Sequence, residues 1–257
     1  MASGAARKRG LRVYRLLGPG ASGWPPGLRV PAGPGPRTSL RVAEGHPRHL
    51  DAHLARLQEG AQAMGAPVPW LLALGEPLVA WLRVQAPGDG ALRMSLYPAE
   101  GLLSACLETL PVTPAPYRLR VLPHPLGDLR GSTLARHKGL TGPWPTAALR
   151  LAQARGAADA LLCWPDATVA ETALALLVLE HRGRLVVPPP GGRVASITEA
   201  LDLPGWAAER QLGIVEAPIH LRDLAEGRLW CLNAVRGFWP AMLEPESPEG
   251  CPWAMPT

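Results

Sequence analysis

The sequence predicts an α+β protein with two domains, and three observations support this prediction. The chain of 257 residues is long enough to form one large core or two smaller ones. Segments with the alternation typical of strands are interspersed with segments of helical spacing. A proline-rich segment, Pro111–Pro116, is typical of a linker. We therefore expect a mobile basic tail at residues 1–12, a small α+β domain at 13–112, a linker at 113–118 and a larger α/β domain at 119–257.

The small domain is expected to contain strands at its beginning and end, with helices between them. Glycines and prolines make residues 18–37 an irregular connection. Apolar spacing predicts a helix that Gly65 would terminate, and an apolar segment that Gly75–Pro77 would kink. The strands are expected at 11–17, 91–97 and 106–112, and the helices at 50–64 and 68–84. A further strand is expected at 117–122, after the proline-rich segment.

The larger domain is expected to alternate between short apolar segments and helices. A threonine would open its first helix after Pro145, and its last 15 residues are expected to be a loosely held tail. The expected elements are, in order, a helix at 146–155, apolar segments at 158–163, 168–180 and 185–188, a helix-like segment headed by 193–198, a strand at 213–219, a brief helix at 221–226 and a strand at 228–232.

Composition excludes several classes of function. The formal charge is +5 and the pI about 9.4, but the arginines are scattered without aromatic interleaving, which argues against a nucleic-acid partner. The four cysteines are far apart, which argues against a zinc site or a disulfide framework. His49 and His53 lack a third ligand, so we expect no metal. With no signal peptide and no apolar span of membrane length, a cytoplasmic protein without a membrane partner is expected.

Lys138 stands out because the chain has 26 lysines and arginines, yet only Lys8 and Lys138 are lysines. An ε-amine can lose its proton and attack a carbonyl, whereas a guanidinium effectively never deprotonates. An alternative is that this lysine survived by chance in an arginine-rich sequence. The residues that follow it favour the chemical interpretation.

Two further features follow Lys138 along the chain. Glu171 lies in a strongly apolar segment, so we expect it to be largely buried and to need a partner. The Pro/Gly segment 188–192 leads to Ser196-Ile-Thr198 at the head of a helix, where hydroxyls and free amides suit a phosphate. A lysine, a buried acid and a phosphate cradle are what pyridoxal phosphate requires.

These features resemble the class IV (fold type IV) pyridoxal-phosphate enzymes, which include branched-chain aminotransferases, D-amino acid aminotransferases and 4-amino-4-deoxychorismate lyase. The resemblance covers roughly residues 33–240. It implies a D-amino acid aminotransferase-like fold, in which the larger domain is a pseudo-barrel that carries the cofactor lysine. The motifs that carry it are Thr38-Ser-Leu-Arg-Val42, His53-Leu-Ala-Arg-Leu57, Lys138 before an Ala-rich helix, Ala158-Asp-Ala-Leu-Leu162, Val169-Ala-Glu-Thr172, Leu185-Val-Val-Pro-Pro189, Ser196-Ile-Thr198 and Cys231–Pro240.

The resemblance also implies roles for individual residues. Lys138 would hold the cofactor and then serve as the mobile acid and base, with a pKa lowered by burial beside the cofactor. Glu171 would pair with the protonated pyridine nitrogen. The phosphate would be held by Arg56, Ile197 and Thr198, with backbone help from Ala234 or Val235. Residues that would meet the substrate are Thr38, Arg41, Asn233 and Arg236.

The choice of reaction rests on the segment after Cys231, which is more similar to the lyase than to the aminotransferases. The lyase would convert 4-amino-4-deoxychorismate to 4-aminobenzoate and pyruvate, a step of folate precursor synthesis. A D-amino acid or branched-chain aminotransferase is the alternative. Departures from the family pattern at Arg37, Pro143 and Leu176 leave room for a relative without catalysis, and the basic charge for a basic binding protein. By analogy with the family, we expect a homodimer that acts on a small molecule.

Overall fold

The computed structural model describes residues 13–17, 35–85 and 88–244. The predicted basic tail, most of the predicted connection 18–37 and the predicted C-terminal tail lie outside the described residues. The chain divides into two compact units, Met1–Pro111 and Val112–Thr257, which we call the small unit and the large unit. Tyr117 is buried and Arg118 opens a strand, so the end of the predicted linker belongs to the large unit.

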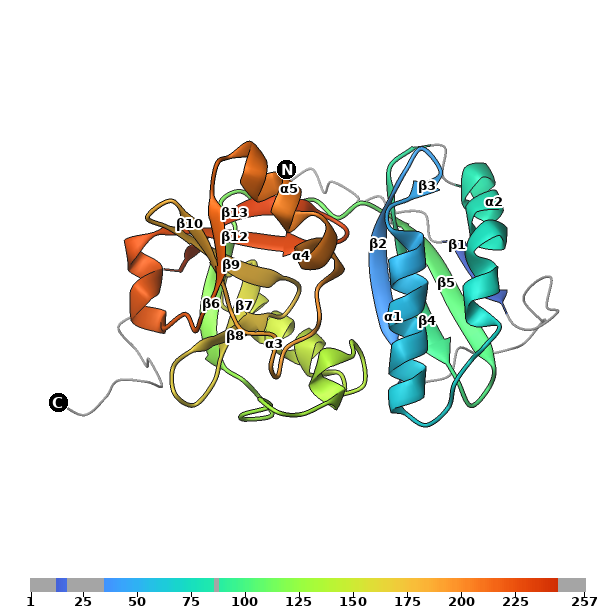
Figure 1. The fold of residues 1–257 in the computed structure, drawn as a ribbon, viewed down its shortest axis with the longest axis horizontal. Coiled ribbons are helices and arrows are strands. Elements are labelled where there is room, and N and C mark those ends of the chain that lie inside the picture. The colour runs from blue at the N-terminus through green and yellow to red at the C-terminus, as the bar shows by residue number, and fades with distance from the viewer. Residues whose placement is uncertain (1–12, 18–34, 86–87, 245–257) are drawn as a thin grey trace, which may run out of the picture. The chain divides into compact units, whose positions relative to one another are not determined.

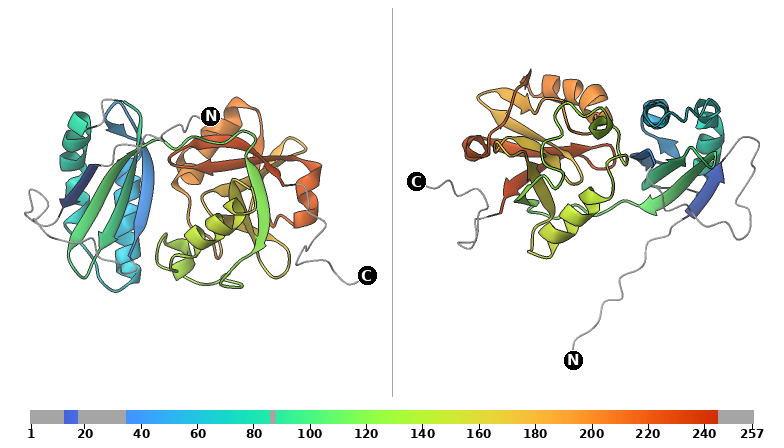
Figure 2. Two further views of the ribbon diagram at one scale, coloured as in Figure 1. Left: turned by 180° about the vertical axis from the view of Figure 1, so that it is seen from behind. Right: turned by 90° about the horizontal axis from the view of Figure 1, so that it is seen from below.

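The small unit is an antiparallel 5-stranded sheet in the order β1-β5-β4-β2-β3. Two α-helices cover the same face of this sheet (Figures 1 and 2). The strands are β1 (Val13–Leu17), β2 (Arg37–Ala43), β3 (His46–Pro47), β4 (Gly90–Tyr97) and β5 (Leu102–Thr109), and the helices are α1 (Leu50–Ala63), the 3-10 helix η1 (Leu71–Leu74) and α2 (Gly75–Gln85).

The core of the small unit forms where the apolar side of α1 meets the sheet. Leu50, Leu54, Leu57 and Ala61 recur at helical spacing and are buried against the sheet core. The predicted helix over 50–64 is therefore confirmed. The predicted kinked helix is also confirmed, because η1 ends and α2 begins at Gly75.

β5 begins four residues before its predicted start at position 106. A tight connection at Pro98–Gly101, with Gly101 at φ 61°, returns the chain directly onto β4. Cross-strand pairing with β4 thus recruits residues whose local pattern alone did not indicate a strand.

The large unit is built on an 8-stranded sheet in the order β11-β10-β9-β12-β13-β6-β7-β8. The pairs β10–β11, β13–β6 and β6–β7 are parallel, and the remaining pairs are antiparallel. The strands are β6 (Arg118–Pro123), β7 (Asp159–Cys163), β8 (Val169–Thr172), β9 (Leu176–His181), β10 (Arg184–Val187), β11 (Gly213–Glu216), β12 (Arg228–Asn233) and β13 (Gly237–Leu243).

Helices cover this sheet in two places (Figure 1). α3 (Trp144–Gln153) packs against β6 and β7, whereas α4 (Ile197–Leu201) and α5 (Leu203–Glu209) pack together over β12 and β11. The remaining helices are the short 3-10 turns η2 (Leu134–Arg136) and η3 (Leu221–Glu226). Among the helices of the described residues, none has the length and apolar character needed to cross a membrane.

α3 starts at Trp144, two residues before its predicted start at Thr146. Pro145 lies in its first turn, where the missing amide hydrogen costs nothing because first-turn amides have no partner within the helix. The apolar side of α3 buries Trp144, Ala148 and Ala152 against β7.

Candidate active site

Lys138 lies on a turn directly after η2, in the connection between β6 and α3. We call residues 124–143 the lysine connection. The Lys138 side chain is exposed in the described chain. The desolvation expected for this lysine therefore depends on the bound cofactor and stays a prediction.

Aromatic rings hold the two ends of the lysine connection together. The buried His124 ring follows β6 and lies between Trp144, the first residue of α3, and Trp164, which follows β7, with ring centroids 4.7 and 4.6 Å away. Burial lowers the pKa of His124 to about 4, so the ring is neutral at physiological pH. These ring contacts hold the beginning of the lysine connection next to the start of α3 and the end of β7.

An ion-pair network holds the middle of the lysine connection. The Arg130 guanidinium pairs with Asp128 and with Asp166, whose carboxylate oxygen is 2.7 Å away. Asp166 also accepts a hydrogen bond of 2.6 Å from the hydroxyl of Thr168, the residue immediately before β8. The connection that carries Lys138 is therefore tied to the β7–β8 turn.

Glu171 lies in the middle of β8 and is buried, which confirms its predicted burial. Burial raises the pKa of Glu171 to about 7, although an amide hydrogen bond from Val194 and the positive charges of Arg193 and Lys138 act in the opposite direction. The Val194 amide donates to the Glu171 carboxyl over 3.4 Å. Glu171 and Lys138 are therefore close enough for their charges to interact.

Thr198 lies in the first turn of α4 with only 1% of its surface exposed. Its hydroxyl oxygen has no hydrogen-bond partner among the described residues. A buried hydroxyl without a partner is costly, so the position suits an oxygen-rich ligand group. Ile197, the first residue of α4, is half-buried, and the Ser196 hydroxyl caps the helix by accepting from the Glu199 amide over 3.2 Å.

The turn between β12 and β13 is organised by the Asn233 side chain. Its amide group donates to the Leu174 carbonyl over 3.1 Å, and its oxygen accepts from the Val235 and Arg236 amides. Asn233 therefore has a structural role in this turn. Because the Val235 amide is already used, Ala234 is the better candidate for the predicted backbone contact with the phosphate.

Arg236 packs beside a pair of aromatic rings that contact each other edge to face, with its guanidinium carbon 5.9 Å from the Tyr117 ring centre and 5.6 Å from that of Trp239. The guanidinium donates to the Tyr117 hydroxyl over 3.4 Å. Tyr117 in turn donates to the fully buried Asp159 over 3.1 Å. The Arg236 Nε atom is buried and has no hydrogen-bond partner among the described residues.

The other predicted site residues belong to the small unit. Thr38 is buried on β2 and its hydroxyl is 2.5 Å from Nδ1 of His53 on α1. Arg41 forms an ion pair with Asp89. Arg56 is half-buried on α1. Their predicted contacts with the cofactor or the substrate stay predictions.

The structure shows where the three departures from the family pattern lie. Arg37 is exposed at the start of β2, and Pro143 immediately precedes α3. Leu176 is buried on β9, in the core cluster that also contains Leu203 and Ala207 of α5. Leu176 therefore fills the space between the sheet and α5.

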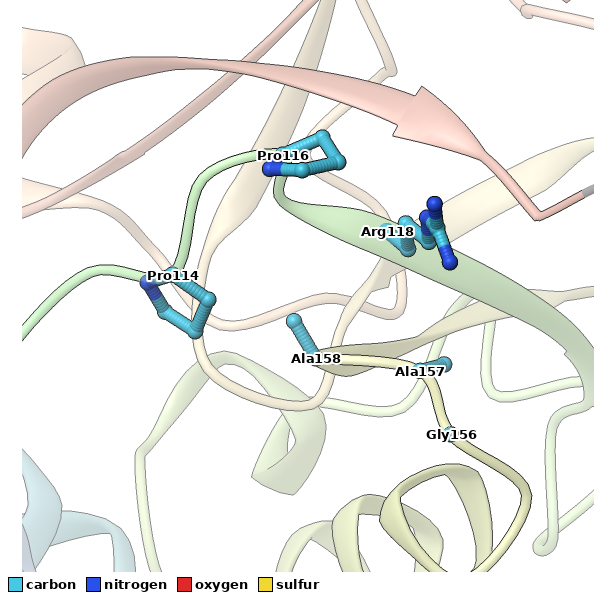
Figure 3. Close-up of a pocket in the computed structure, with 6 residues that line it drawn as sticks. All are labelled: Pro114, Pro116, Arg118, Gly156, Ala157 and Ala158. Carbon is cyan, nitrogen blue, oxygen red and sulfur yellow. The ribbon is translucent and has the colours of Figure 1, made fainter.

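Two open pockets of the large unit are lined by other residues than the predicted cofactor site. One, of about 320 Å³, is lined by Pro114, Pro116, Arg118 and the segment Gly156–Ala158 (Figure 3). A second, of about 340 Å³, lies between residues 113–117 and 239–242. Neither is lined by Lys138, Glu171 or Thr198, so the chemistry of the site and not pocket shape identifies it.

Sequence reasoning missed two buried charged residues near the site. Arg193 is 1% exposed and lies in the connection between β10 and α4. Asp159 is fully buried at the start of β7, where burial raises its pKa and hydrogen bonds from Thr172, Ala160 and Tyr117 oppose that shift. The burial of Asp159 could have been predicted, because it is a single acidic residue in an otherwise apolar segment. The local sequence carries no signal for the burial of Arg193, because its partner Glu199 is six residues further along the chain.

The chain matches the model of the family described as "Amino-transferase class IV" over residues 37–242. No curated protein matches the sequence. Among solved structures, a candidate 4-amino-4-deoxychorismate lyase is 27% identical, with a TM-score of 0.69, and the match covers 90% of this chain and 95% of that one.

Two further structures share the fold at lower identity. A hypothetical aminotransferase from Mycobacterium tuberculosis, with α-ketoglutarate and PMP bound, has a TM-score of 0.75 at 20% identity, covering 91% of this chain and 94% of its own. A candidate 4-amino-4-deoxychorismate lyase from Legionella pneumophila has a TM-score of 0.71 at 22% identity, covering 82% and 83%. The family match spans both units and includes Lys138, Glu171 and Thr198. The chain therefore belongs to the class IV aminotransferase family, an enzyme family whose cofactor is pyridoxal 5'-phosphate.

Proposed function

We propose that the protein is a pyridoxal-phosphate-dependent lyase that converts 4-amino-4-deoxychorismate to 4-aminobenzoate and pyruvate. The observation that carries the cofactor site is the buried Glu171 carboxyl within electrostatic reach of Lys138. The lyase reaction is supported by the 27% identity to a candidate lyase across nearly both whole chains. The resemblance of the segment after Cys231 to the lyase supports it as well.

The described residues fit this cofactor in charge and polarity. The buried Thr198 hydroxyl has no hydrogen-bond partner among the described residues and suits a phosphate oxygen, and the Ile197 and Ala234 amides would be further donors. Glu171 suits a protonated ring nitrogen, which would offset the cost of burying an ionised carboxyl. When bound, the cofactor supplies an electron sink for the electrons left after proton removal.

Lys138 would move the proton of the reaction. Its amine nitrogen would take a proton from the substrate ring as the carbon–oxygen bond to the pyruvate-derived group breaks, and a proton would return to the departing enol to give pyruvate. The loss of that proton makes the ring aromatic. Lys138 lies on an exposed turn, and its long side chain suits a group that has to move a proton between two positions.

Arg236 is our candidate in the large unit for a substrate carboxylate. Its buried Nε atom has no hydrogen-bond partner among the described residues, and its guanidinium packs beside the Tyr117 and Trp239 rings. Arg–carboxylate pairs are strong because both donors of the fork can be used. Thr38 and Arg41 are weaker candidates, since each already contacts a residue of the small unit.

An aminotransferase acting on a D-amino acid or a branched-chain amino acid is the second candidate. It is favoured by the Mycobacterium tuberculosis structure, which matches the fold at the higher TM-score of 0.75. The same Lys138, Glu171 and Thr198 would serve either reaction. We also propose that the protein is cytoplasmic and that it is a homodimer, as its family members usually are. Analytical ultracentrifugation would test the dimer, because the dimer has twice the mass of one chain.

The test begins with cofactor binding. We expect purified protein with pyridoxal 5'-phosphate to show a visible absorbance band that borohydride abolishes, and Lys138→Ala to show none. Lys8→Ala is the matched control, because it removes the only other lysine of the chain and should leave the band unchanged. A band retained in Lys138→Ala would contradict the assignment of the lysine.

The reaction is tested separately on the loaded protein. We expect release of fluorescent 4-aminobenzoate and pyruvate in equal amounts from 4-amino-4-deoxychorismate. Keto-acid formation from D-alanine or L-leucine, without 4-aminobenzoate release, would instead support the aminotransferase. Lys138→Ala should lose at least about a thousandfold in rate, as expected when a proton-transfer residue is removed.

A further inference from the structure

The segment Gly192–Ser196, which we call the bridging segment, joins the proposed cofactor-contacting parts of the large unit. It is the second half of the connection between β10 and α4, and it ends at Ser196, the N-cap residue of α4. Two of its amides contact separate parts of the site. The Val194 amide donates to the Glu171 carboxyl over 3.4 Å, and the Ala195 amide donates to the Arg136 carbonyl over 3.2 Å. Arg136 is two residues before Lys138.

The beginning of the bridging segment packs directly on the lysine connection. Gly192 has φ +82°, and a Cβ atom at this position would lie 2.7 Å from the Arg130 amide nitrogen and 2.8 Å from the Leu129 carbonyl carbon. Only glycine allows so close an approach of two backbones. The end of the bridging segment is Ser196, whose hydroxyl caps the helix that carries Thr198.

A buried arginine fixes the bridging segment from within. The Arg193 guanidinium is 1% exposed and forms two hydrogen bonds of 2.8 Å to the two carboxylate oxygens of Glu199. It also donates to the Pro188 carbonyl over 2.8 Å and to the Pro189 carbonyl over 3.2 Å. Such a bidentate pair fixes geometry more strictly than a single bond, and it closes the loop from the end of β10 to the first turn of α4.

We propose that Arg193 is a positioning residue that sets Thr198 and Glu171 in place relative to the lysine connection. Glu199 directly follows Thr198, and Val194 directly follows Arg193, so the arginine holds the chain on both sides of the bridging segment. Arg193 has no contact with the cofactor in this proposal and acts through these neighbours. The proposal rests on the proposed cofactor roles of Lys138, Glu171 and Thr198, and it is independent of the substrate.

A merely stabilising role of the ion pair makes a different prediction from a positioning role. General loosening of the large unit would weaken the binding of pyridoxal 5'-phosphate and of pyridoxal, which lacks the phosphate, by similar factors. Displacement of the first turn of α4 would remove mainly the contribution of the phosphate. The ratio of the two affinities therefore separates the two roles.

The experiment measures the affinity of cofactor-free protein for pyridoxal 5'-phosphate, for pyridoxal and for inorganic phosphate as a competitor. In Arg193→Met we expect the preference for the phosphorylated form to fall at least about tenfold, which corresponds to one charge-assisted hydrogen bond. Pyridoxal affinity should change by less than about threefold. Arg193→Lys should recover part of the preference, because it restores the charge but not the fork.

The matched control is Arg120→Met, which removes an ion pair of 3.0 Å to Glu244 elsewhere in the large unit. It should leave the preference unchanged even where it lowers the melting temperature. If Arg193→Met does not fold, Glu199→Gln takes its place, and its preference for pyridoxal 5'-phosphate over pyridoxal tests the proposal. An unchanged preference in the folded variants, or an equal loss for both ligands, would overturn the proposal.

A failure of the Arg193 proposal can be distinguished from a failure of the proposed lyase function. Wild-type protein that prefers pyridoxal 5'-phosphate but makes no 4-aminobenzoate would refute the lyase and leave the test of Arg193 intact. Wild-type protein with no preference for the phosphorylated form would overturn both the cofactor role of Thr198 and the positioning role of Arg193.

Discussion

Glu171 and Arg193 show at the scale of single residues what local sequence does and does not reveal. The apolar segment around Glu171 predicted its burial, which the structure confirms. The burial of Arg193 was not predicted, because the cost of burying a guanidinium is offset by Glu199 and by the Pro188 and Pro189 carbonyls. These partners come together only when the connection between β10 and α4 has folded.

Burial of Glu171 predicts a pH dependence of stability in the cofactor-free protein. Its pKa is about 7 in the folded chain against 4.5 as the ordinary value, so the folded state holds a proton that the unfolded state has lost between these values. The stabilisation is fully present below pH 4.5 and is lost as the pH rises through 7. Its full size is about 3 kcal/mol.

Urea denaturation at pH 5, 6, 7 and 8 checks this prediction. We expect the free energy of unfolding of the wild type to fall across this range relative to that of Glu171→Gln, which does not titrate. Glu209→Gln is the control, because Glu209 is 77% exposed and should not alter the slope. A wild type and Glu171→Gln with parallel pH profiles would show that Glu171 is not buried in the way described.

At the scale of elements, the helices and most strands follow from local patterns, whereas the pairings do not. The spacing of Leu50, Leu54 and Leu57 was sufficient to predict α1. The β12–β13 hairpin was predicted only as a single strand, because its turn depends on the Asn233 side chain reaching Leu174 from another part of the sheet. Likewise, Thr198 was identified by its place at a helix start, but only the packed structure shows that its hydroxyl is buried without a hydrogen-bond partner in the described part of the chain.

The close approach of the bridging segment to the lysine connection predicts a specific glycine effect. Gly192→Ala introduces a Cβ atom against the Leu129 and Arg130 backbone in addition to the cost of a positive φ. Gly183→Ala is the matched control, because Gly183 has φ +72° and nothing within 4 Å of the added atom. We expect Gly192→Ala to destabilise the chain by about 1–3 kcal/mol more than Gly183→Ala.

Denaturation of both variants measures that difference, and cofactor titration shows its effect on the site. We expect Gly192→Ala to weaken pyridoxal 5'-phosphate binding and Gly183→Ala to leave it unchanged. Equal stabilities of the two variants would mean that the backbones do not approach as closely as described.

At the scale of the whole molecule, each unit has its own hydrophobic core. The small-unit core contains Leu57 on α1 and the large-unit core contains Leu177 on β9, and both side chains are fully buried. A proline-rich segment separates the units, and the division at Pro111 and Val112 lies at its start. The sequence indicated this segment because prolines disfavour both helix and central strand.

Separate cores predict that damage to one unit stays in that unit. We expect Leu57→Ala to lower the stability of the small unit by about 2–5 kcal/mol. Hydrogen exchange should then accelerate in α1 and β2, with protection in β9 and β12 unchanged. Leu177→Ala should show the reverse pattern. Loss of protection in both units from either variant would show that they unfold together.

The contacts of the bridging segment also limit how this chain can change during evolution. Gly192, Val194 and Ala195 each meet a different partner, so an insertion or deletion between them would shift at least one out of register. Exposed surface loops in general tolerate changes in length far better. New substrate preferences in descendants of this chain should therefore arise by point substitution around the site, while the spacing from Gly192 to Ser196 stays the same.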